Sequence, residues 1–246
     1  MKAKDFDRHC STLPAPIALS LQHAVQCIDA IGQMKKYCST LEIFTRYLAA
    51  IAYAEYCSYP KEDSIETIVT EAQRSISNGE AIKRVQAILR ALRSKEDPFL
   101  LDLIDWFFDE KGKASPYVEQ LLSLIQRRNR FIHKELSLEE MKDFPIELCA
   151  LFDSATWLQD YQFFVLLQQD PIAPVGFDGV LRWLVGLGLP SDTTQATWQN
   201  IRLYTKQIYL LDCEKNRFLC LSPFLLWHHD PLCNEEKLHC RAFDLG

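Results

Sequence analysis

One stretch of the sequence combines residue types that can act together on a phosphate group. Residues 127–134 read Arg-Arg-Asn-Arg-Phe-Ile-His-Lys and carry four positive charges within eight positions. A histidine that exchanges a proton beside fixed guanidinium groups supplies what phosphodiester cleavage requires, namely a general acid or base and a stabiliser of developing negative charge. This stretch therefore predicts a site for phosphate chemistry.

Arg128 holds the most informative position in this stretch. Its neighbours on the same face of a helix are apolar, at Leu121, Leu124, Ile125 and Ile132. A permanently charged guanidinium on such a stripe needs an acidic partner, a second subunit or a bound anion. Glu42 is a candidate for the acidic partner, and a helix-capping role for Glu42 is the alternative.

Asn129 and His133 form a second pair, because they are four residues apart. On a helix this spacing places both side chains on one flank, where they can bind the same group. The alternative interpretation of the whole stretch involves no chemistry, since solvated cations at the C-terminal end of a helix interact favourably with the helix dipole. An Arg followed five positions later by a His also arises by chance, so spacing alone does not decide.

The elements that must position these residues are predicted to be helices up to about residue 160. Apolar residues recur at intervals of three and four over 17–31 and over 82–92. A further helix is predicted at 64–76, and a last one at 145–160. We expect six or seven helices joined by short loops.

Several residue pairs in this part are typical of helix starts. They are Ser39 with Glu42, Asp97 with Pro98, Ser115 with Pro116, and Ser137 with Glu140. The Asp97 pair predicts a helix over 99–108. The Ser115 pair begins the helix that carries residues 127–134, and the Ser137 pair implies that this helix stops before residue 137.

Beyond residue 160 the sequence changes character, because glycine and proline divide it into short apolar runs. Strands are predicted at 161–167, 180–187, 207–212 and 218–221, with 238–243 able to add a last strand. The polar residues 213–217 suit a hairpin turn. The fold class expected is α+β, with a mainly helical bundle over residues 1–160 and a small antiparallel β-rich region over 161–246.

Composition limits the classes of protein that fit. The 246 residues include 27 Lys and Arg against 33 Asp and Glu, a net charge of −6, which argues against nonspecific coating of nucleic acid. The longest apolar run, 47–54, is too short to span a bilayer, so no membrane association is expected. The N-terminus lacks the features of a signal sequence. A cytoplasmic protein with reduced cysteines is therefore expected.

Cysteines and histidines gather near the C-terminus and raise the question of zinc. They are Cys213, Cys220, His228, His229, Cys233, His239 and Cys240. No Cys-x2-Cys pair occurs among them, and Glu236 stands where a zinc knuckle would place a second thiol. No Gly-rich phosphate loop or nucleophile elbow is recognisable either. We therefore expect neither a metal nor a cofactor.

The segment Arg128-Asn129-Arg130-Phe131-Ile132-His133 resembles the Arg-x4-His signature of the HEPN superfamily, the higher eukaryotes and prokaryotes nucleotide-binding domains. The Asn after the Arg, the number of helices and the late position of the motif agree with that family. The resemblance covers about residues 14–160. Residues 13–19 and 221–226 also resemble stretches of bacterial proteins of this type, which are often found in toxin or antiphage defence systems.

The resemblance implies a metal-independent endoribonuclease, active as a homodimer, that leaves a 2′,3′-cyclic phosphate and a 5′-hydroxyl. His133 would act as general base or acid, Arg128 would bind the scissile phosphate, and Asn129 would orient one of them. The RNA backbone would be guided by Arg127, Arg130 and Lys134. An antitoxin or a defence complex would be the protein partner. The alternatives are a catalytically silent sensor or adaptor in such a complex, and a binder of RNA or nucleotides without chemistry.

Overall fold

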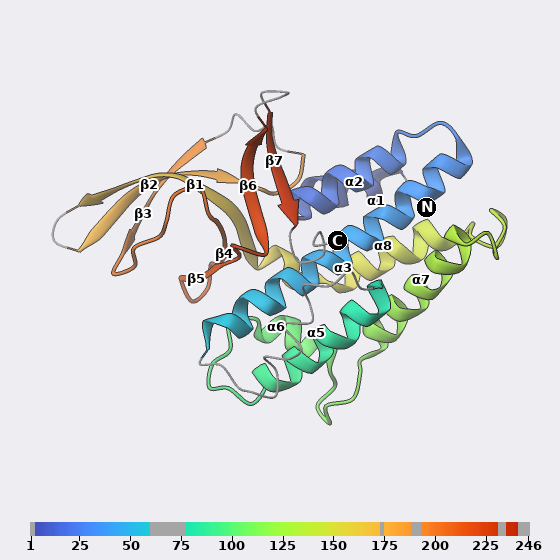
Figure 1. Cartoon of the computed structure of the whole chain (residues 1–246), viewed down its shortest axis with the longest axis horizontal. Coiled ribbons are helices and arrows are strands. Elements are labelled where there is room, and N and C mark those ends of the chain that lie inside the picture. Colours follow the sequence, from blue (N-terminus) through green and yellow to red (C-terminus); the bar gives the residue numbers. More distant parts are fainter. Residues whose placement is uncertain (1–2, 60–76, 173–174, 188–192, 231–234, 241–246) are drawn as a thin grey trace.

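The computed structural model describes residues 3–59, 77–172, 175–187, 193–230 and 235–240. Within these ranges the chain is a mixed α+β protein, which confirms the predicted class, with seven α-helices and a five-stranded antiparallel sheet. The helices pack together on one side of the molecule and the sheet lies beside them (Figure 1). The helix predicted at 64–76 lies outside the described residues.

The helical part is organised around one long helix. Its members are α1 (Ala3–Thr12), α2 (Ala15–Val25), α3 (Ala30–Ser58), α5 (Asn78–Leu92), α6 (Leu101–Phe107), α7 (Pro116–Ile132) and α8 (Phe144–Ser154), followed by the 3-10 helix η1 (Thr156–Gln159). The 29-residue α3 contacts α2, α5, α7 and α8. Because α3 contacts helices that precede it and helices that follow it in the chain, it is the element against which the other helices are positioned.

The apolar pattern over 17–31, predicted as one helix, is divided between two helices. α2 ends at Val25 and α3 begins at Ala30, where the Asp29 carboxylate accepts a backbone N–H of the first turn at 2.5 Å. Ile28 lies in the connection and is fully exposed. The prediction is wrong here because apolar spacing continues across a boundary that a side-chain cap imposes.

Two predicted helix starts are also wrong. Ser39 and Glu42 lie inside α3, where the Ser39 hydroxyl donates to a carbonyl of the preceding turn at 3.1 Å. Asp97 has a left-handed φ of 50°, and the next helix begins only at Leu101. A capping pattern starts a helix only where the preceding turn is broken, and nothing breaks α3 before Ser39.

The start and the end of α7 confirm the prediction. The Ser115 hydroxyl accepts the Val118 N–H at 3.4 Å, and the helix stops at Ile132. Ser137 and Glu140 do form reciprocal hydrogen bonds, but these close a turn rather than start a helix. α8 begins after that turn and ends at residue 154, so the helix predicted at 145–160 is shorter, with η1 completing it.

The main sheet has the strand order β3-β2-β1-β4-β5, and every neighbouring pair is antiparallel. Its strands are β1 (Tyr161–Ile172), β2 (Gly176–Trp183), β3 (Thr193–Gln199), β4 (Ile208–Asp212) and β5 (Arg217–Cys220). The turn at 213–216 joins β4 to β5 as predicted. β3 was not expected, because its threonine- and glutamine-rich sequence is almost wholly exposed and lacks apolar alternation.

A separate hairpin, β6 (Leu225–Asp230) with β7 (Glu235–Cys240), follows the main sheet. The strand predicted at 238–243 corresponds to β7, but β7 pairs with β6 and adds no strand to the main sheet. Figure 1 shows the hairpin standing between the sheet and the helices, and it contacts both α3 and β4. It therefore bridges the two parts of the molecule.

One continuous hydrophobic core joins the helices to the sheet. Phe163, Val165 and Leu210 face the bundle and belong to the same buried cluster as the helical residues. Phe164 and Tyr209 face the other way, into a smaller cluster of their own. The alternation of residues along β1 thus gives the sheet two buried faces, as expected for a period of two.

Glu55 makes the main polar connection at this joint. It is buried in α3, where its carboxylate accepts the backbone N–H groups of Phe99 at 2.6 Å and Leu100 at 3.0 Å. Nearby, Asp97 forms ion pairs with Lys215 at 2.5 Å and Arg217 at 2.9 Å from the β4–β5 hairpin. The loop before α6 is thus held by α3 on one side and by the sheet on the other.

The pH dependence of stability should report on Glu55. Burial raises the pKa of this carboxyl above its ordinary value of 4.5, against the opposing effect of its N–H donors. The folded state therefore binds the proton more tightly than the unfolded state. We expect the free energy of unfolding of the wild type, relative to the non-titrating Glu55→Gln variant, to fall as pH rises from 4.5 through the folded pKa. Urea titrations at several pH values measure this difference, and a constant or rising difference contradicts the prediction.

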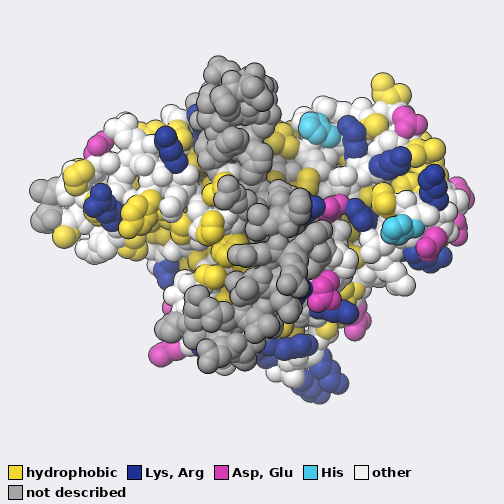
Figure 2. All heavy atoms as spheres, in the orientation of Figure 1, with side chains coloured by type: hydrophobic (Ala, Val, Ile, Leu, Met, Phe, Trp, Pro, Cys, Tyr) yellow, Lys and Arg dark blue, Asp and Glu magenta, His cyan; other side chains and the backbone are white. Residues whose placement is uncertain are grey.

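The described helices and the charged surface limit how the protein meets membranes and ligands. No helix among them is long and apolar enough to cross a membrane. On the face drawn in Figure 2, Lys and Arg side chains lie among Asp and Glu side chains over the helical part. The positive charge available to a ligand therefore depends on which cations are paired with acids.

Candidate functional site

All six residues predicted to form a site lie at the C-terminal end of α7 or directly after it. Val118, Leu121, Leu124 and Ile125 are buried and hold the preceding turns of the helix against the bundle. Arg128 continues this inward stripe by one turn. The packing of α7 therefore decides where the Arg128 side chain points.

Arg128 reaches α3 and forms an ion pair there. One of its terminal nitrogens lies 2.5 Å from Glu42 Oε2, and the other donates to Asn129 Oδ1 at 3.1 Å. The pair is half-buried, with about a fifth of the Arg128 side chain exposed. Glu42 is thus the acidic partner of Arg128, and the capping role considered for it is wrong because α3 runs straight through residue 42.

Glu42 is shared between two arginines. Its other carboxylate oxygen, Oε1, accepts a hydrogen bond from Arg46, one turn further along α3, at 2.8 Å. Arg128 Nε is buried and has no hydrogen-bond partner among the described residues. The guanidinium is therefore held by Glu42 and Asn129, while its Nε–H is left without an acceptor among the described residues.

Cys38 lies beside this cluster and is not suited to be a nucleophile. It is buried one turn before Glu42, and burial raises the pKa of its thiol to about 12 although Arg128 acts in the opposite direction. A thiol with that pKa stays protonated at neutral pH. Cys38 therefore contributes packing to the site rather than covalent chemistry.

Arg127 and Arg130 point to other partners. Arg127 forms an ion pair with Glu147 of α8 at 2.6 Å and lies over the Phe144 ring. Arg130 lies 3.6 Å from Glu135 in the following turn. Each of the three arginines in the motif thus has a carboxylate partner, so the basic stretch is largely neutralised within the monomer.

His133 and Lys134 are the exposed members of the group. His133 is the C-cap of α7, and its backbone N–H donates to the Asn129 carbonyl at 3.0 Å. Lys134 has a φ of 63°, so the chain turns away there. The Asn129 side chain accepts a hydrogen bond from Arg128, and the prediction that Asn129 and His133 bind the same group stays a prediction. The imidazole is open to solvent and to a ligand.

The ion pair between Arg128 and Glu42 can be measured by a double-mutant cycle. We expect Arg128→Met and Glu42→Gln to show a coupling of about 1 kcal/mol in urea unfolding, because the pair is half-buried and hydrogen-bonded. The exposed pair of Lys142 and Glu139, changed to Met and Gln, serves as the matched control, and its coupling should stay below about 0.5 kcal/mol. Equal coupling in the two pairs would contradict the structural role of Glu42.

Sequence reasoning missed two parts of this cluster. Arg46 shares Glu42, and Glu147 holds Arg127, yet neither was considered. The spacing of Glu42 and Arg46 was an available signal, since residues four apart on a helix can pair. The Glu147 partner could not be found in this way, because it depends on how α8 packs against α7.

Comparisons with known proteins add no family to this geometry. No protein-family model, curated protein or solved structure matches the chain. The chemical interpretation therefore rests on the contacts of the described residues.

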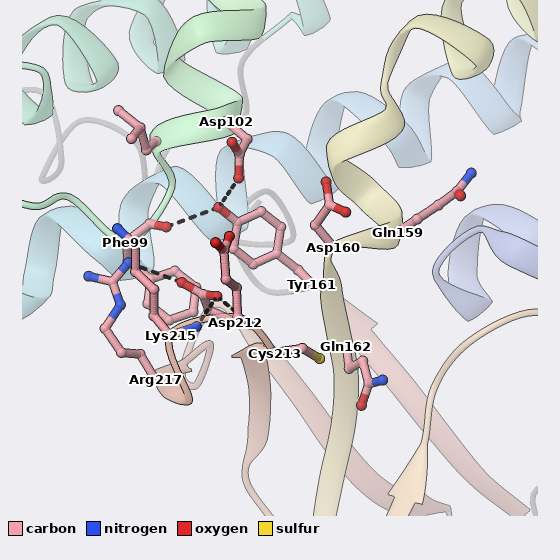
Figure 3. Close-up of a pocket in the computed structure, with 12 residues that line it drawn as sticks. Phe99, Asp102, Gln159, Asp160, Tyr161, Gln162, Asp212, Cys213, Lys215 and Arg217 are labelled. Carbon is pink, nitrogen blue, oxygen red and sulfur yellow. Dashed lines mark hydrogen bonds and ion pairs between the residues drawn. The ribbon is translucent and has the colours of Figure 1, made fainter.

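Apart from this cluster, a cavity lies at the joint between the helices and the sheet (Figure 3). It has a volume of about 510 Å³ and is lined by groups from α6, η1, β1 and the β4–β5 hairpin. The Tyr161 hydroxyl lies 2.9 Å from Asp102 Oδ2 and 3.0 Å from the Phe99 carbonyl. Burial and the neighbouring carboxylates of Asp102, Glu214 and Asp212 raise the pKa of Asp160.

The contacts around this cavity are mostly structural. Arg217 lies 3.1 Å from Asp212, and the Asp212 carboxylate also accepts two backbone N–H groups of the hairpin turn. Within the described residues, no group of three or more His, Cys, Asp or Glu side chains could hold a metal ion. Cys233 and the side chains of His228, His229, His239 and Cys240, which were considered for zinc, lie outside the described part of the structure.

Proposed function

We propose that the chain is a metal-independent endoribonuclease in which Arg128 and His133 act on the same phosphodiester. The observation that carries this proposal is the anchoring of Arg128 by Glu42 on the helix whose C-cap, five residues later, is the exposed His133. A guanidinium held in place loses little freedom when it binds a phosphate. An exposed histidine at the end of the same helix can move protons on and off the reacting oxygens.

The proposed reaction uses the ribose 2′-hydroxyl as nucleophile. His133 accepts the 2′-hydroxyl proton while the oxygen attacks phosphorus, and the bond to the 5′-oxygen breaks. The leaving 5′-oxygen takes up a proton, and the products are a 2′,3′-cyclic phosphate and a 5′-hydroxyl. Arg128 stabilises the additional negative charge on the phosphate in the transition state, and Asn129 orients Arg128.

A homodimer is part of the proposal. A single imidazole must serve first as base and then as acid, whereas two copies meeting at the end of α7 place a second His133 on the other side of the phosphate. The resemblance of the motif to HEPN proteins supports the same arrangement and a HEPN-like helical bundle. It also supports a role as a toxin or antiphage protein in a prokaryotic cytoplasm, with an antitoxin or defence-complex partner.

The ion pairs favour a second candidate function. Because Arg127, Arg128 and Arg130 each contact a carboxylate, the helix end could serve only to hold the bundle together. The chain would then be a catalytically silent sensor or adaptor of a defence complex. Such a protein leaves RNA intact and depends on a larger partner for its effect.

Cleavage of RNA in a chelator decides between these functions. The purified protein is incubated with total RNA in EDTA, and the new ends are mapped. Cyclic phosphate and 5′-hydroxyl ends support the proposal. Intact RNA, 3′-hydroxyl ends, or loss of cleavage in EDTA would overturn it.

A further inference from the structure

A second basic region of the chain carries its charge differently from the α7 motif. Residues 81–95 contain five Lys and Arg and no Asp or Glu, in a chain whose net charge is −6. Most of this segment forms α5. Ile82, Val85 and Leu89 face the core, so Arg90 and Arg93 project from the exposed side.

The turn between α6 and α7 extends this charged side of α5. Arg93 donates to the Glu110 carbonyl at 3.1 Å, and the Arg90 guanidinium lies 5.2 Å from the centre of the Phe108 ring. Gly112 has a φ of 77°, and a Cβ there would lie 3.0 Å from Arg93, so glycine permits the close approach of the turn. Two exposed lysines, Lys111 and Lys113, are carried by the same turn.

These contacts assemble four cations, which we call the α5 basic surface: Arg90, Arg93, Lys111 and Lys113. In Figure 2, Lys and Arg side chains gather over α5 and the loop before α7, at the lower edge of the view. The same turn carries the acids Asp109 and Glu110, which leave the surface a net charge of about +2. None of the four cations forms an ion pair within the described part of the chain.

The contrast with α7 identifies which positive charge is available to a polyanion. The arginines of the motif are paired with carboxylates, so a phosphate must compete for them. Of the α5 basic surface, Arg93 is positioned by a carbonyl and Arg90 by an aromatic ring, and neither of these partners is an acid. A phosphate that binds the α5 basic surface therefore displaces no ion pair of the described residues, whereas a phosphate that binds the motif arginines must displace one.

The two regions lie along one helix. The 109–113 turn leads directly into α7, whose 17 residues end beside Arg128 and His133. A helix of that length spans about 25 Å. An extended polyanion that contacts both ends of α7 must cover this distance, which a mononucleotide cannot do.

We propose that the α5 basic surface is a docking site for the RNA backbone, remote from the site of cleavage. The identity of the polyanion rests on the proposed function, whereas the binding surface itself rests on the charges of α5 and the turn. Phosphates on this surface would supply most of the affinity, and the motif would contribute chemistry to an RNA already held. RNA length should therefore matter, because a short oligonucleotide cannot reach both regions.

Neutralising the two lysines tests the docking site. Lys111→Gln with Lys113→Gln is placed in a His133→Ala background so that RNA stays intact, and binding of a fluorescent 20-nucleotide RNA is followed by anisotropy. Each lost contact removes roughly 0.7 from the slope of log K against log salt, or about fivefold in affinity at 0.1 M salt. We expect binding about 25-fold weaker and a slope smaller by about 1.4. The matched control, Arg202→Gln with Lys206→Gln, removes the same charge from an exposed loop of the sheet region.

The outcomes separate this inference from the proposed function. Equal RNA affinity in the lysine and control variants overturns the docking site, even if the wild type cleaves RNA. RNA binding that depends on the lysines, in a wild-type protein that does not cleave, supports the docking site and removes the nuclease. Phosphatidylserine vesicles form a further arm. If the lysine variant loses vesicle binding while RNA binding is unchanged, the surface serves a membrane and the inference is wrong.

Discussion

Replacing His133 with alanine is expected to reduce RNA cleavage by about 10²- to 10⁴-fold, the usual contribution of a general acid or base. The side chain is exposed at the C-cap of α7, so its removal leaves no buried group unpaired. The free energy of unfolding should change by less than about 0.5 kcal/mol. Initial rates on a labelled RNA, measured beside urea unfolding curves, check both parts of this expectation.

His23 provides the matched control. It is another exposed histidine, in the last turn of α2, and it is distant in sequence from the motif. His23→Ala should cut RNA at the wild-type rate. If His133→Ala retains wild-type activity, or if both variants lose activity together, His133 is not the catalytic base.

Replacing Glu55 with alanine is expected to destabilise the fold by about 2–5 kcal/mol. The variant leaves the N–H groups of Phe99 and Leu100 buried without an acceptor, and each such group costs about 1–3 kcal/mol. Glu55→Gln should fall between alanine and wild type, because its amide oxygen can accept only one of the two bonds at full strength. Chemical unfolding measures the loss directly.

Glu119→Ala is the control for this change, since Glu119 is an exposed glutamate of α7. It should alter stability by about 0.5 kcal/mol or less. The loss in Glu55→Ala should also loosen the connection between the helices and the sheet, which hydrogen exchange at Phe99 and Leu100 would report. A loss below 1 kcal/mol with unchanged exchange would show that Glu55 does not hold the joint.

The helices that could be predicted are those whose packing pattern and boundary signals agree. α5 has apolar residues at helical spacing, and Ser115 with Pro116 marks the start of α7. Where the apolar pattern and the boundary signal disagree, the predicted helix boundary is wrong. Asp29 divides an apolar pattern that continues across it, and Ser39 imitates a cap inside α3. A local sequence pattern fixes the boundary of a helix only where no competing interaction overrides it.

The exposed β3 and the pairing of β7 show a different limit. β3 owes its place to the ladder with β2 rather than to apolar alternation. β7 pairs with β6 and not with the main sheet, and the hairpin that the two strands form contacts α3 and β4. Neither property can be read from the strand's own residues, since whether a strand joins a sheet depends on its contacts with other elements.

The sequence by itself determined three properties of the motif: four positive charges within residues 127–134, their place at the end of a helix, and the inward position of Arg128. The last of these follows because helical periodicity relates residues three and four apart. Only the tertiary structure decided which charges remain free. It brought Glu42 to Arg128 across 86 residues of chain, paired Arg127 with Glu147, and left the cations of the α5 basic surface without an ion pair to any described residue. The physical reason is that an ion pair depends on distance in space, which sequence separation does not determine.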